Sequence, residues 1–357
     1  MFKILSEGCV FLETKVTYTY AVPRTVVLPD GEILCCFHRT VGGGVNDMTP
    51  LLSYSSDNGI TWSDPVLAYP ELEGKKGFVI TPRNMPDGRI SFGGEGWEIN
   101  EPGELWWSEE VGGMRENRLF WCISDDGRKM SQLNYITLPI YSGAEQPSGI
   151  LVRRDGVYMF LHSCCLTVEA REPVITNQMV LLTSDDEGRS FSAKPVGKLD
   201  YPGTHAEAWI VELPDDRLMM CSWVTDGPDL IFLSDDKGGT FSNPIEMPFG
   251  GQTMSLTPLP DGRVLIPYNY RVPGENLGVR LAVVRPGIDS VEVLYDAQAW
   301  KAETSTKDGR GENFDNFTSY AFGEPQVSVM PDGTLLLVIW VDQPDGTGVR
   351  YVRLALD

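Results

Sequence analysis

The chain of 357 residues is poor in positive charge, in histidine and in long apolar runs. It has 29 lysines and arginines against 50 aspartates and glutamates, which gives a formal net charge of -21. So acidic a surface repels nucleic-acid phosphates, and we expect no nucleic-acid partner. No apolar run approaches the roughly 18 residues of a membrane span, and the N-terminal segment lacks the apolar stretch of a signal peptide. We therefore expect a cytoplasmic protein without a membrane partner.

Paired cysteine motifs and metal motifs are also absent from the sequence. The seven cysteines are an odd number and none is spaced C-x-x-C, although Cys35 and Cys36 are adjacent, as are Cys164 and Cys165. Both pairs lie in apolar runs, so we interpret them as buried free thiols, with a catalytic thiol as the alternative. There is no H-E-x-x-H segment and no EF-hand loop, and the glycines at 42–44 precede no helical pattern. We expect no metal and no cofactor.

What the sequence does contain is a repeated turn. Six times an apolar run, a turn of the P-D-G type and a second apolar run follow one another. Proline sets φ, aspartate bonds to the turn backbone and glycine accepts positive φ, so each segment predicts a β-hairpin. The turns centre on Asp30, Asp87, Asp155, Asp215, Asp261 and Asp332, which are 46 to 71 residues apart.

A second repeat follows the first and has the pattern S-x-D-x-G-x-T-W. Residues 55–62 match it throughout, residues 184–191 and 234–241 match it with a final phenylalanine, and residues 124–127 are a degenerate copy. Aspartate and serine side chains satisfy turn amides here, and the aromatic ring packs between sheets. We expect these turns to stabilise the fold and to take no part in catalysis.

Together the repeats predict an all-β fold. Six units of about 60 residues, each with about four short strands, indicate a six-bladed β-propeller. We predict that residues 1–357 form one such domain. The strand near residues 9–12 should complete the last blade, which ends at residues 349–354.

The S-x-D-x-G-x-T-W turns resemble the Asp-box (BNR) repeats of the sialidase superfamily, and this resemblance covers the whole chain. It implies the propeller fold and a glycosidase activity. Residues 206–215, A-E-A-W-I-V-E-L-P-D, resemble the sialidase segment whose glutamate assists a tyrosine nucleophile. By that resemblance Glu207 is the catalytic glutamate.

Other positions depart from the sialidase pattern. Ala21 occupies the place of the arginine that grips the sialate carboxylate, and Arg24 follows three residues later. No arginine occurs at 219–223, where sialidases carry another. Glu324 stands where the tyrosine is expected, with Tyr320 four residues upstream. These departures imply a relative that acts on another sugar, not an authentic sialidase.

The turns also predict which residues share one face, without reference to any family. An inner strand runs from that face to the turn and the next strand returns, so residues about eight positions from each turn aspartate should meet there. Before the turns this rule selects Glu145, Gln146, His205, Glu207, Gln252 and Glu324. After the turns it selects His38, Arg39, Glu95, His162, Trp223, Asn269, Arg271, Trp340 and Asp342. All three histidines of the chain are among them.

Facing carboxylates are what glycosyl transfer requires, because one protonates the leaving oxygen while the other attacks or activates water. Glu207 and Glu324 hold the same strand position two blades apart, and Asp47 matches the place of the sialidase general acid. We predict these three as catalytic, the alternative for each being a structural or solvated residue. We predict substrate contacts from Arg24, His38, Arg39, Arg83, Glu95, Trp97, Gln146, His162, His205, Trp223, Gln252, Asn269, Arg271 and Tyr320.

Two kinds of residue in that set have a second interpretation. Arg24, Arg39 and Arg83 would hold an anionic substrate or pair with neighbouring acids. Trp97, in an insert with Trp106 and Trp107, would stack on a sugar or plug the space between blades.

We predict an exo-acting glycoside hydrolase that removes a terminal sugar from a carbohydrate substrate. The alternatives are a uronate lyase with a histidine or tyrosine base and a non-catalytic sugar-binding propeller. A metal held by the three histidines is a lesser alternative, and the sequence predicts no oligomeric state.

Overall fold

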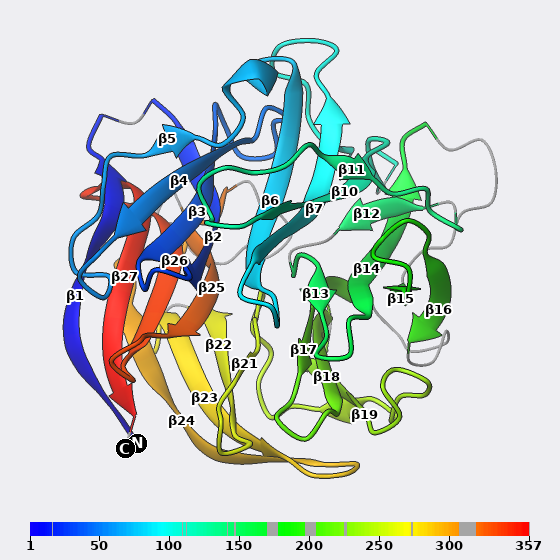
Figure 1. Cartoon of the computed structure of the whole chain (residues 1–357). Helices are drawn as coiled ribbons and strands as arrows, with labels where there is room; N and C mark the ends of the chain where they lie inside the picture. Colours follow the sequence, from blue (N-terminus) through cyan, green and yellow to red (C-terminus); the bar gives the residue numbers. More distant parts are fainter. Residues whose placement is uncertain are drawn as a thin grey trace.

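The computed structural model describes residues 1–15, 17–108, 110–111, 113–140, 142–145, 148–169, 178–196, 205–224, 227–272, 274–306 and 319–356. Within these residues 27 strands form six sheets, arranged as the blades of a propeller (Figure 1). The six-bladed fold predicted from the repeats is confirmed.

The first three blades account for the N-terminal half of the chain. The first consists of β2 (Thr19–Val27), β3 (Ile33–Thr40), β4 (Thr49–Ser55) and β5 (Val66–Leu67). A 3-10 helix, η1 (Pro70–Leu72), leads to the second, which consists of β6 (Lys76–Asn84), β7 (Ile90–Glu98), β10 (Arg118–Ser124) and β11 (Asn134–Tyr135). The third contains β12 (Gly143–Glu145), β13 (Leu151–Val152), β14 (Tyr158–Thr167), β15 (Gln178–Ser184) and β16 (Ser192–Val196). The short strands β8 (Trp107–Ser108) and β9 (Gly113–Met114) join this third sheet through β14.

The last three blades complete the ring. The fourth consists of β17 (His205–Glu212), β18 (Leu218–Val224), β19 (Leu230–Ser234) and β20 (Ile245–Glu246). The fifth consists of β21 (Thr257–Pro258), β22 (Val264–Tyr270), β23 (Gly278–Pro286) and β24 (Val291–Lys301). The sixth consists of β25 (Phe322–Val329), β26 (Leu335–Gln343), β27 (Gly346–Leu356) and β1 (Phe2–Glu13).

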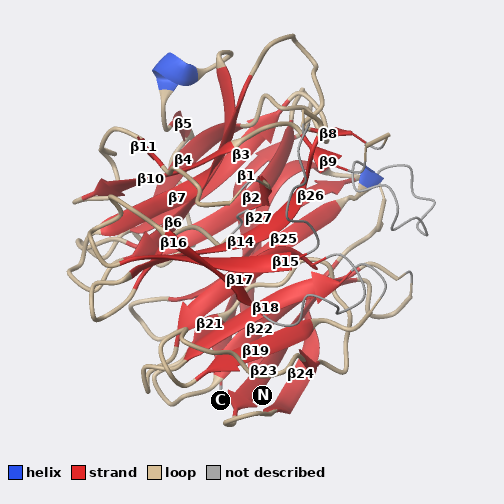
Figure 2. Ribbon diagram, turned by 90° about the vertical axis from the view of Figure 1, so that its right-hand side faces the viewer, coloured by secondary structure: helices blue, strands red, loops and turns tan. Residues whose placement is uncertain are grey.

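The two ends of the chain meet in this sixth blade. The strand β1 pairs antiparallel with β27, so that Cys9 lies opposite Arg350 and Leu12 opposite Gly348. The termini lie side by side in both views (Figures 1 and 2). The closure predicted from the sequence is confirmed.

Hydrogen bonds inside the turns explain why the repeats fold alike. The Oδ1 of Asp57 accepts the amides of Ile60 (3.1 Å) and Thr61 (2.8 Å), and its Oδ2 accepts the Thr61 hydroxyl (2.6 Å). Asp186 makes the same three contacts, and Asp236 repeats two of them. These aspartates therefore fix the local reversal, as the second repeat predicted.

Five of the seven cysteines are buried in the interior, and Cys9 and Cys165 are partly exposed. All seven are free thiols, and Cys35, Cys36 and Cys221 have no exposed surface. Burial raises the pKa of the Cys164 thiol to about 12, which opposes formation of a thiolate nucleophile. Among the described residues, no helix is long and apolar enough to cross a membrane.

Candidate active site

Three inner strands contain the same irregularity close to their first residues. In β2, β17 and β25 the antiparallel ladder is interrupted by a register shift of the β-bulge kind. The first residue inside each shift has a positive φ angle: 52° at Val22, 46° at Glu207 and 53° at Glu324. A bulge changes the direction of a side chain, and positive φ is unfavourable for residues other than glycine. The strained positions of β17 and β25 therefore bring two glutamates to one end of the propeller.

Glu207 is held by two neutral donors from its own blade and the segment that follows. The indole Nε1 of Trp223 donates to its Oε2 over 2.6 Å, and the hydroxyl of Thr253 donates to the same oxygen. Hydrogen bonds of this kind are strongest when the acceptor carries a charge. The two donors therefore fix the position of the Glu207 carboxyl group.

Two further carboxyls surround Glu207, and both are shifted toward the protonated form. The Oε2 of Glu145 accepts the Glu207 amide (3.3 Å), and the Oε2 of Glu324 accepts the Val22 amide (2.7 Å). Burial, followed by the charge of Glu207, raises the pKa of Glu145 above its ordinary value. Burial also raises the pKa of Glu324, against the opposing effect of Arg24. The site thus places two carboxyls whose pKa values are raised beside Glu207, which accepts hydrogen bonds from Trp223 and Thr253.

Three of the arginines predicted to contact substrate bond to main-chain carbonyls instead, and two of them, Arg24 and Arg271, lie near the glutamates. Arg24 and Arg271 are buried, with 1% and 7% of their surface exposed, and Arg83 is half-buried. Their bonds run from Arg24 to the carbonyl of Glu324 (2.9 Å), from Arg83 to those of Ser148 (3.2 Å) and Ile210 (2.7 Å), and from Arg271 to that of Phe322 (2.7 Å). The sequence left open whether Arg24 and Arg83 meet a substrate or an acid, and the structure gives both a main-chain partner.

Two of these contacts link different blades of the propeller. Arg24 extends from β2 to β25, and Arg83 extends from β6 to β17. Both guanidinium groups also lie over the ring of Trp209, with their central carbons 5.2 and 5.5 Å from its centroid. Burial lowers the pKa of Arg83 to about 10, so the group stays charged at neutral pH. Arg24 therefore joins the first blade to the sixth, and Arg83 joins the second blade to the fourth.

Two of the histidines predicted to bind substrate, His38 and His162, lie in the interior. His38 has no exposed surface, and its Nε2 accepts the amide of Ile80 (2.9 Å), which joins the first blade to the second. His162 is also fully buried, and burial lowers its pKa to about 4. Neither ring meets solvent where a ligand would bind. The side chain of His205 and the whole of Gln146 lie outside the described residues.

Asp47 and Arg39 are engaged in contacts of their own. Asp47 accepts the hydroxyl of Thr40 (2.5 Å) and the amide of Val41 (3.2 Å), which closes the loop after β3. Arg39 pairs with Glu73 and lies over the ring of Tyr18. These bonds are local, and the described contacts of Asp47 do not include the three glutamates.

Glu95 and Trp97 lie on β7 beside the acids. Burial and then the charges of Glu145 and Glu95 raise the pKa of Cys165, which places both glutamates close to one thiol. Trp97 is 4% exposed and belongs to one buried cluster with Val22 and Met114. The indole therefore plugs the space between blades, which was the second interpretation of this tryptophan.

The remaining predicted residues surround Arg271. Its Nη1 donates to the Oε1 of Gln252 (3.0 Å), and its guanidinium lies 3.9 Å from the ring centre of Tyr320. Asn269 is 2% exposed, and its side-chain amide has no hydrogen-bond partner among the described residues. Gln252 and Tyr320 thus lie next to Arg271. Burial lowers the pKa of this arginine, and the charges of Tyr320, Glu207 and Glu324 act in the opposite direction.

The sequence did not predict a role in catalysis for two residues of the site. Glu145 was selected by its distance from the turn, but it was not predicted to be catalytic. Thr253 follows the selected Gln252, and no pattern in the sequence signals its bond to Glu207. Among the described residues, no three His, Cys, Asp or Glu side chains are grouped as metal ligands.

Comparisons with known proteins agree on the fold. No protein-family model matches the sequence, and no curated protein matches it. A protein of unknown function from Dyadobacter fermentans DSM 18053 superposes with a TM-score of 0.76 at 19% identity, covering 100% of this chain and 99% of that chain.

Sialidases also superpose on the whole propeller. The NanB sialidase from Streptococcus pneumoniae has a TM-score of 0.67 at 15% identity and covers 98% of this chain and 70% of its own. The intramolecular trans-sialidase from Ruminococcus gnavus has a TM-score of 0.64 at 13% identity and covers 98% of this chain and 97% of its own. At such identities the likeness concerns architecture, and it shows that this chain has the six-bladed propeller fold of the sialidases.

Proposed function

We propose that this protein is an exo-acting glycoside hydrolase that removes a terminal neutral sugar. The observation that carries the proposal is the meeting of Glu145, Glu207 and Glu324, of which Glu145 and Glu324 have raised pKa values and Glu207 accepts two side-chain hydrogen bonds. Glycoside hydrolysis uses neighbouring carboxyls in different roles, with a raised pKa for the one that donates the proton. A sugar-binding protein without activity has no need of buried carboxyls with raised pKa values beside a third carboxyl.

The proposed mechanism assigns each carboxyl by its contacts. Glu207, held in position by hydrogen bonds from Trp223 and Thr253, attacks the anomeric carbon or activates the water that does so. A protonated Glu145 or Glu324 donates its proton to the leaving glycosidic oxygen. In each of these two residues one oxygen accepts a main-chain amide, and the other oxygen is left to carry the proton.

The arginines support a neutral substrate. A clamp for a carboxylate requires guanidinium N–H groups that are directed at the ligand. Here Arg24, Arg83 and Arg271 direct N–H groups at main-chain carbonyls instead. An anionic sugar would also meet three acids and a chain of net charge -21.

The test is a screen of neutral 4-nitrophenyl glycosides with Glu207→Gln as the matched variant. Glu207→Gln should lose roughly 10²–10⁴ in kcat, since it keeps the shape and removes the charge. Its melting temperature should stay the same or rise, because one of three neighbouring acids is neutralised. Aryl sialosides should be poor substrates.

Leaving-group dependence then identifies the acid. Of Glu145→Gln and Glu324→Gln, the variant that lacks the proton donor should keep most of its activity on 2,4-dinitrophenyl glycosides, whose leaving group needs no proton. Efficient sialoside turnover would contradict the neutral substrate class. Full activity of Glu207→Gln would remove that residue from the mechanism, and an unsaturated product formed without uptake of ¹⁸O from water would indicate a lyase.

A further inference from the structure

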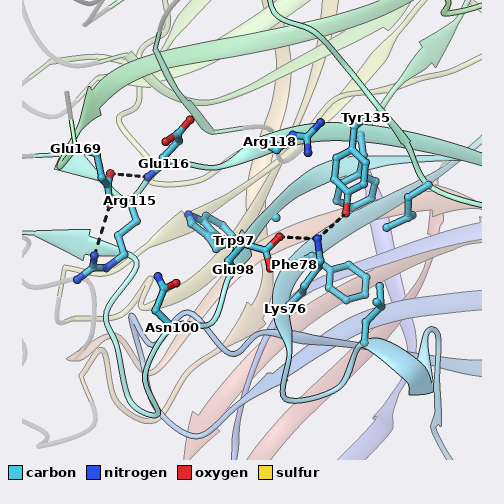
Figure 3. A pocket seen from close by; sticks show the side chains of 14 residues that line it. Lys76, Phe78, Trp97, Glu98, Asn100, Arg115, Glu116, Arg118, Tyr135 and Glu169 are labelled. Atoms are coloured by element: carbon cyan, nitrogen blue, oxygen red, sulfur yellow. Dashed lines mark hydrogen bonds and ion pairs between the residues drawn. The ribbon is translucent and has the colours of Figure 1, made fainter. Parts of the chain in front are cut away.

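A separate hollow lies on the second blade, away from the three glutamates. Its volume is about 290 Å³, and it is lined mainly by side chains of β6, β7, β10 and β11 (Figure 3). That volume is near the lower end of small-ligand sites, which suits one ring-sized group.

The hollow exists because the middle strand of the sheet lacks a side chain at this point. Phe78, Gly96 and Arg118 are paired across β6, β7 and β10, so they face the same side of the sheet. A Cβ at Gly96 would lie 3.2 Å from the Cβ of Phe78 and 3.5 Å from the ring of Phe120. The glycine thus leaves space beside Phe78 and Phe120, which are themselves 3% and 1% exposed, and Tyr135 is the exposed aromatic ring of the hollow.

Polar groups joined to one another form the rim. The Nζ of Lys76 donates to Glu98 Oε1 (2.6 Å) and to the hydroxyl of Tyr135 (3.3 Å). The guanidinium of Arg118 lies 4.3 Å from the ring centre of Tyr135, which is 36% exposed. Figure 3 shows Lys76 between Glu98 and Tyr135. An exposed aromatic ring can pack against the C–H face of a sugar ring, and the fixed donors and acceptors beside it can bind the sugar hydroxyls.

The hollow opens on the same end of the propeller as the glutamates. Lys76 is the first residue of β6, Glu98 the last of β7 and Arg118 the first of β10, just as Glu207 and Glu324 lie near the first residues of their strands. Trp97 lines the hollow and belongs to the buried cluster of Val22, whose amide binds Glu324.

We propose that this hollow is a second sugar-binding site, which takes a neutral pyranose ring against Tyr135. Its lining carries no net formal charge, because Lys76, Arg115 and Arg118 are balanced by Glu98, Glu116 and Glu169. Two of the cations are already paired with Glu98, Glu104 and Glu169. A strongly charged ligand would have to break these pairs. The site binds sugar whether or not the proposed hydrolase activity holds.

Saturation-transfer NMR on the Glu207→Gln protein tests the site. The probes are methyl β-D-glucopyranoside, methyl β-D-galactopyranoside and methyl α-D-mannopyranoside, with D-glucuronate and D-glucosamine as charged comparators. Tyr135→Ala should weaken binding of the neutral glycoside about fivefold or more, because the ring is the stacking surface. Tyr135→Phe keeps the ring and should bind within about twofold of the parent.

The variants are chosen so that folding does not decide the result. Tyr135 is exposed, and Arg285→Ala, at an exposed position of the fifth blade, controls for a change of surface. Neutral binding that is equal in Tyr135→Ala and in the parent would overturn the proposal. So would the absence of transfer to all three neutral glycosides, or preference for glucuronate or glucosamine. The hydrolase proposal is tested by turnover, and this site is tested by binding.

Discussion

Protonation at Glu145 and Glu324 links the chemistry of the site to the stability of the protein. Burial, aided by neighbouring acids, raises the pKa of both groups. The folded protein therefore holds these protons more tightly than the unfolded chain, where glutamate has a pKa of about 4.3. Stability must fall as the pH rises from that value through the raised pKa values of the folded state.

Glu145→Gln should remove part of this pH dependence. Glutamine resembles the protonated acid, so the melting temperature of the variant should match the parent at about pH 5 and exceed it at about pH 9. His38 and His162 titrate alike in both proteins, so their effect cancels in the difference. Glu292→Gln, at an exposed carboxyl, is the control. A melting-temperature difference that does not change with pH would contradict the raised pKa.

Single residues show how far the sequence could define the site. Glu207 and Glu324 were predicted from their equal distance to a turn, which is a local property of the chain. Arg24 binds the main-chain carbonyl of a residue 300 positions away. Such a partner cannot be predicted from residue types, because every residue has a main-chain carbonyl. His38 was selected by the same rule as the glutamates, yet its ring packs inward, because the rule gives height along a strand and not the side that a side chain faces.

Strands and turns were predicted well where residue type controls the backbone. Glycine provides positive φ in five of the six hairpin turns, and Asp216 does so in the remaining one. The bulges of β2, β17 and β25 have valine and glutamate at positive φ instead, and these residues do not ordinarily favour that conformation. The tertiary structure imposes the bulges, and for this reason the sequence did not predict them.

The strain at Val22 should reverse the usual order of stability of the alanine and glycine variants. Glycine accepts a φ of 52° freely, whereas alanine does not. Val22→Gly should therefore be more stable than Val22→Ala by about 1 kcal/mol in urea unfolding, although the glycine variant loses one more buried carbon atom. At Val26, a buried residue of the same strand without positive φ, alanine should be the better substitute by roughly 0.5–1 kcal/mol. The same order at both sites would mean that Val22 is not strained.

At the scale of the molecule, the stability of the propeller depends on the strand pairing that closes its ring of blades. The chain closes the ring without a covalent bond, through the ten paired positions of β1 and β27. The residues of β1 also complete the core, since Val10 is 6% exposed and packs with Phe37 and Tyr351. An open sixth blade would expose the edge of β27, and unpaired edges invite aggregation.

Deletion of residues 1–13 should therefore destabilise the whole ring, by an amount on the order of 5 kcal/mol from the lost ladder and packing. The matched control is a circular permutant in which the adjacent termini are joined by a short linker and new ends are opened at Ile288, which is 80% exposed. That permutant keeps β1 beside β27 and transfers the non-covalent closure to β23 and β24, so its melting temperature should remain close to that of the parent. Thermal unfolding of both proteins decides the matter. A truncated protein as stable as the permutant would show that the sixth blade holds together on three strands, and that the pairing of the two chain ends is not what closes the propeller.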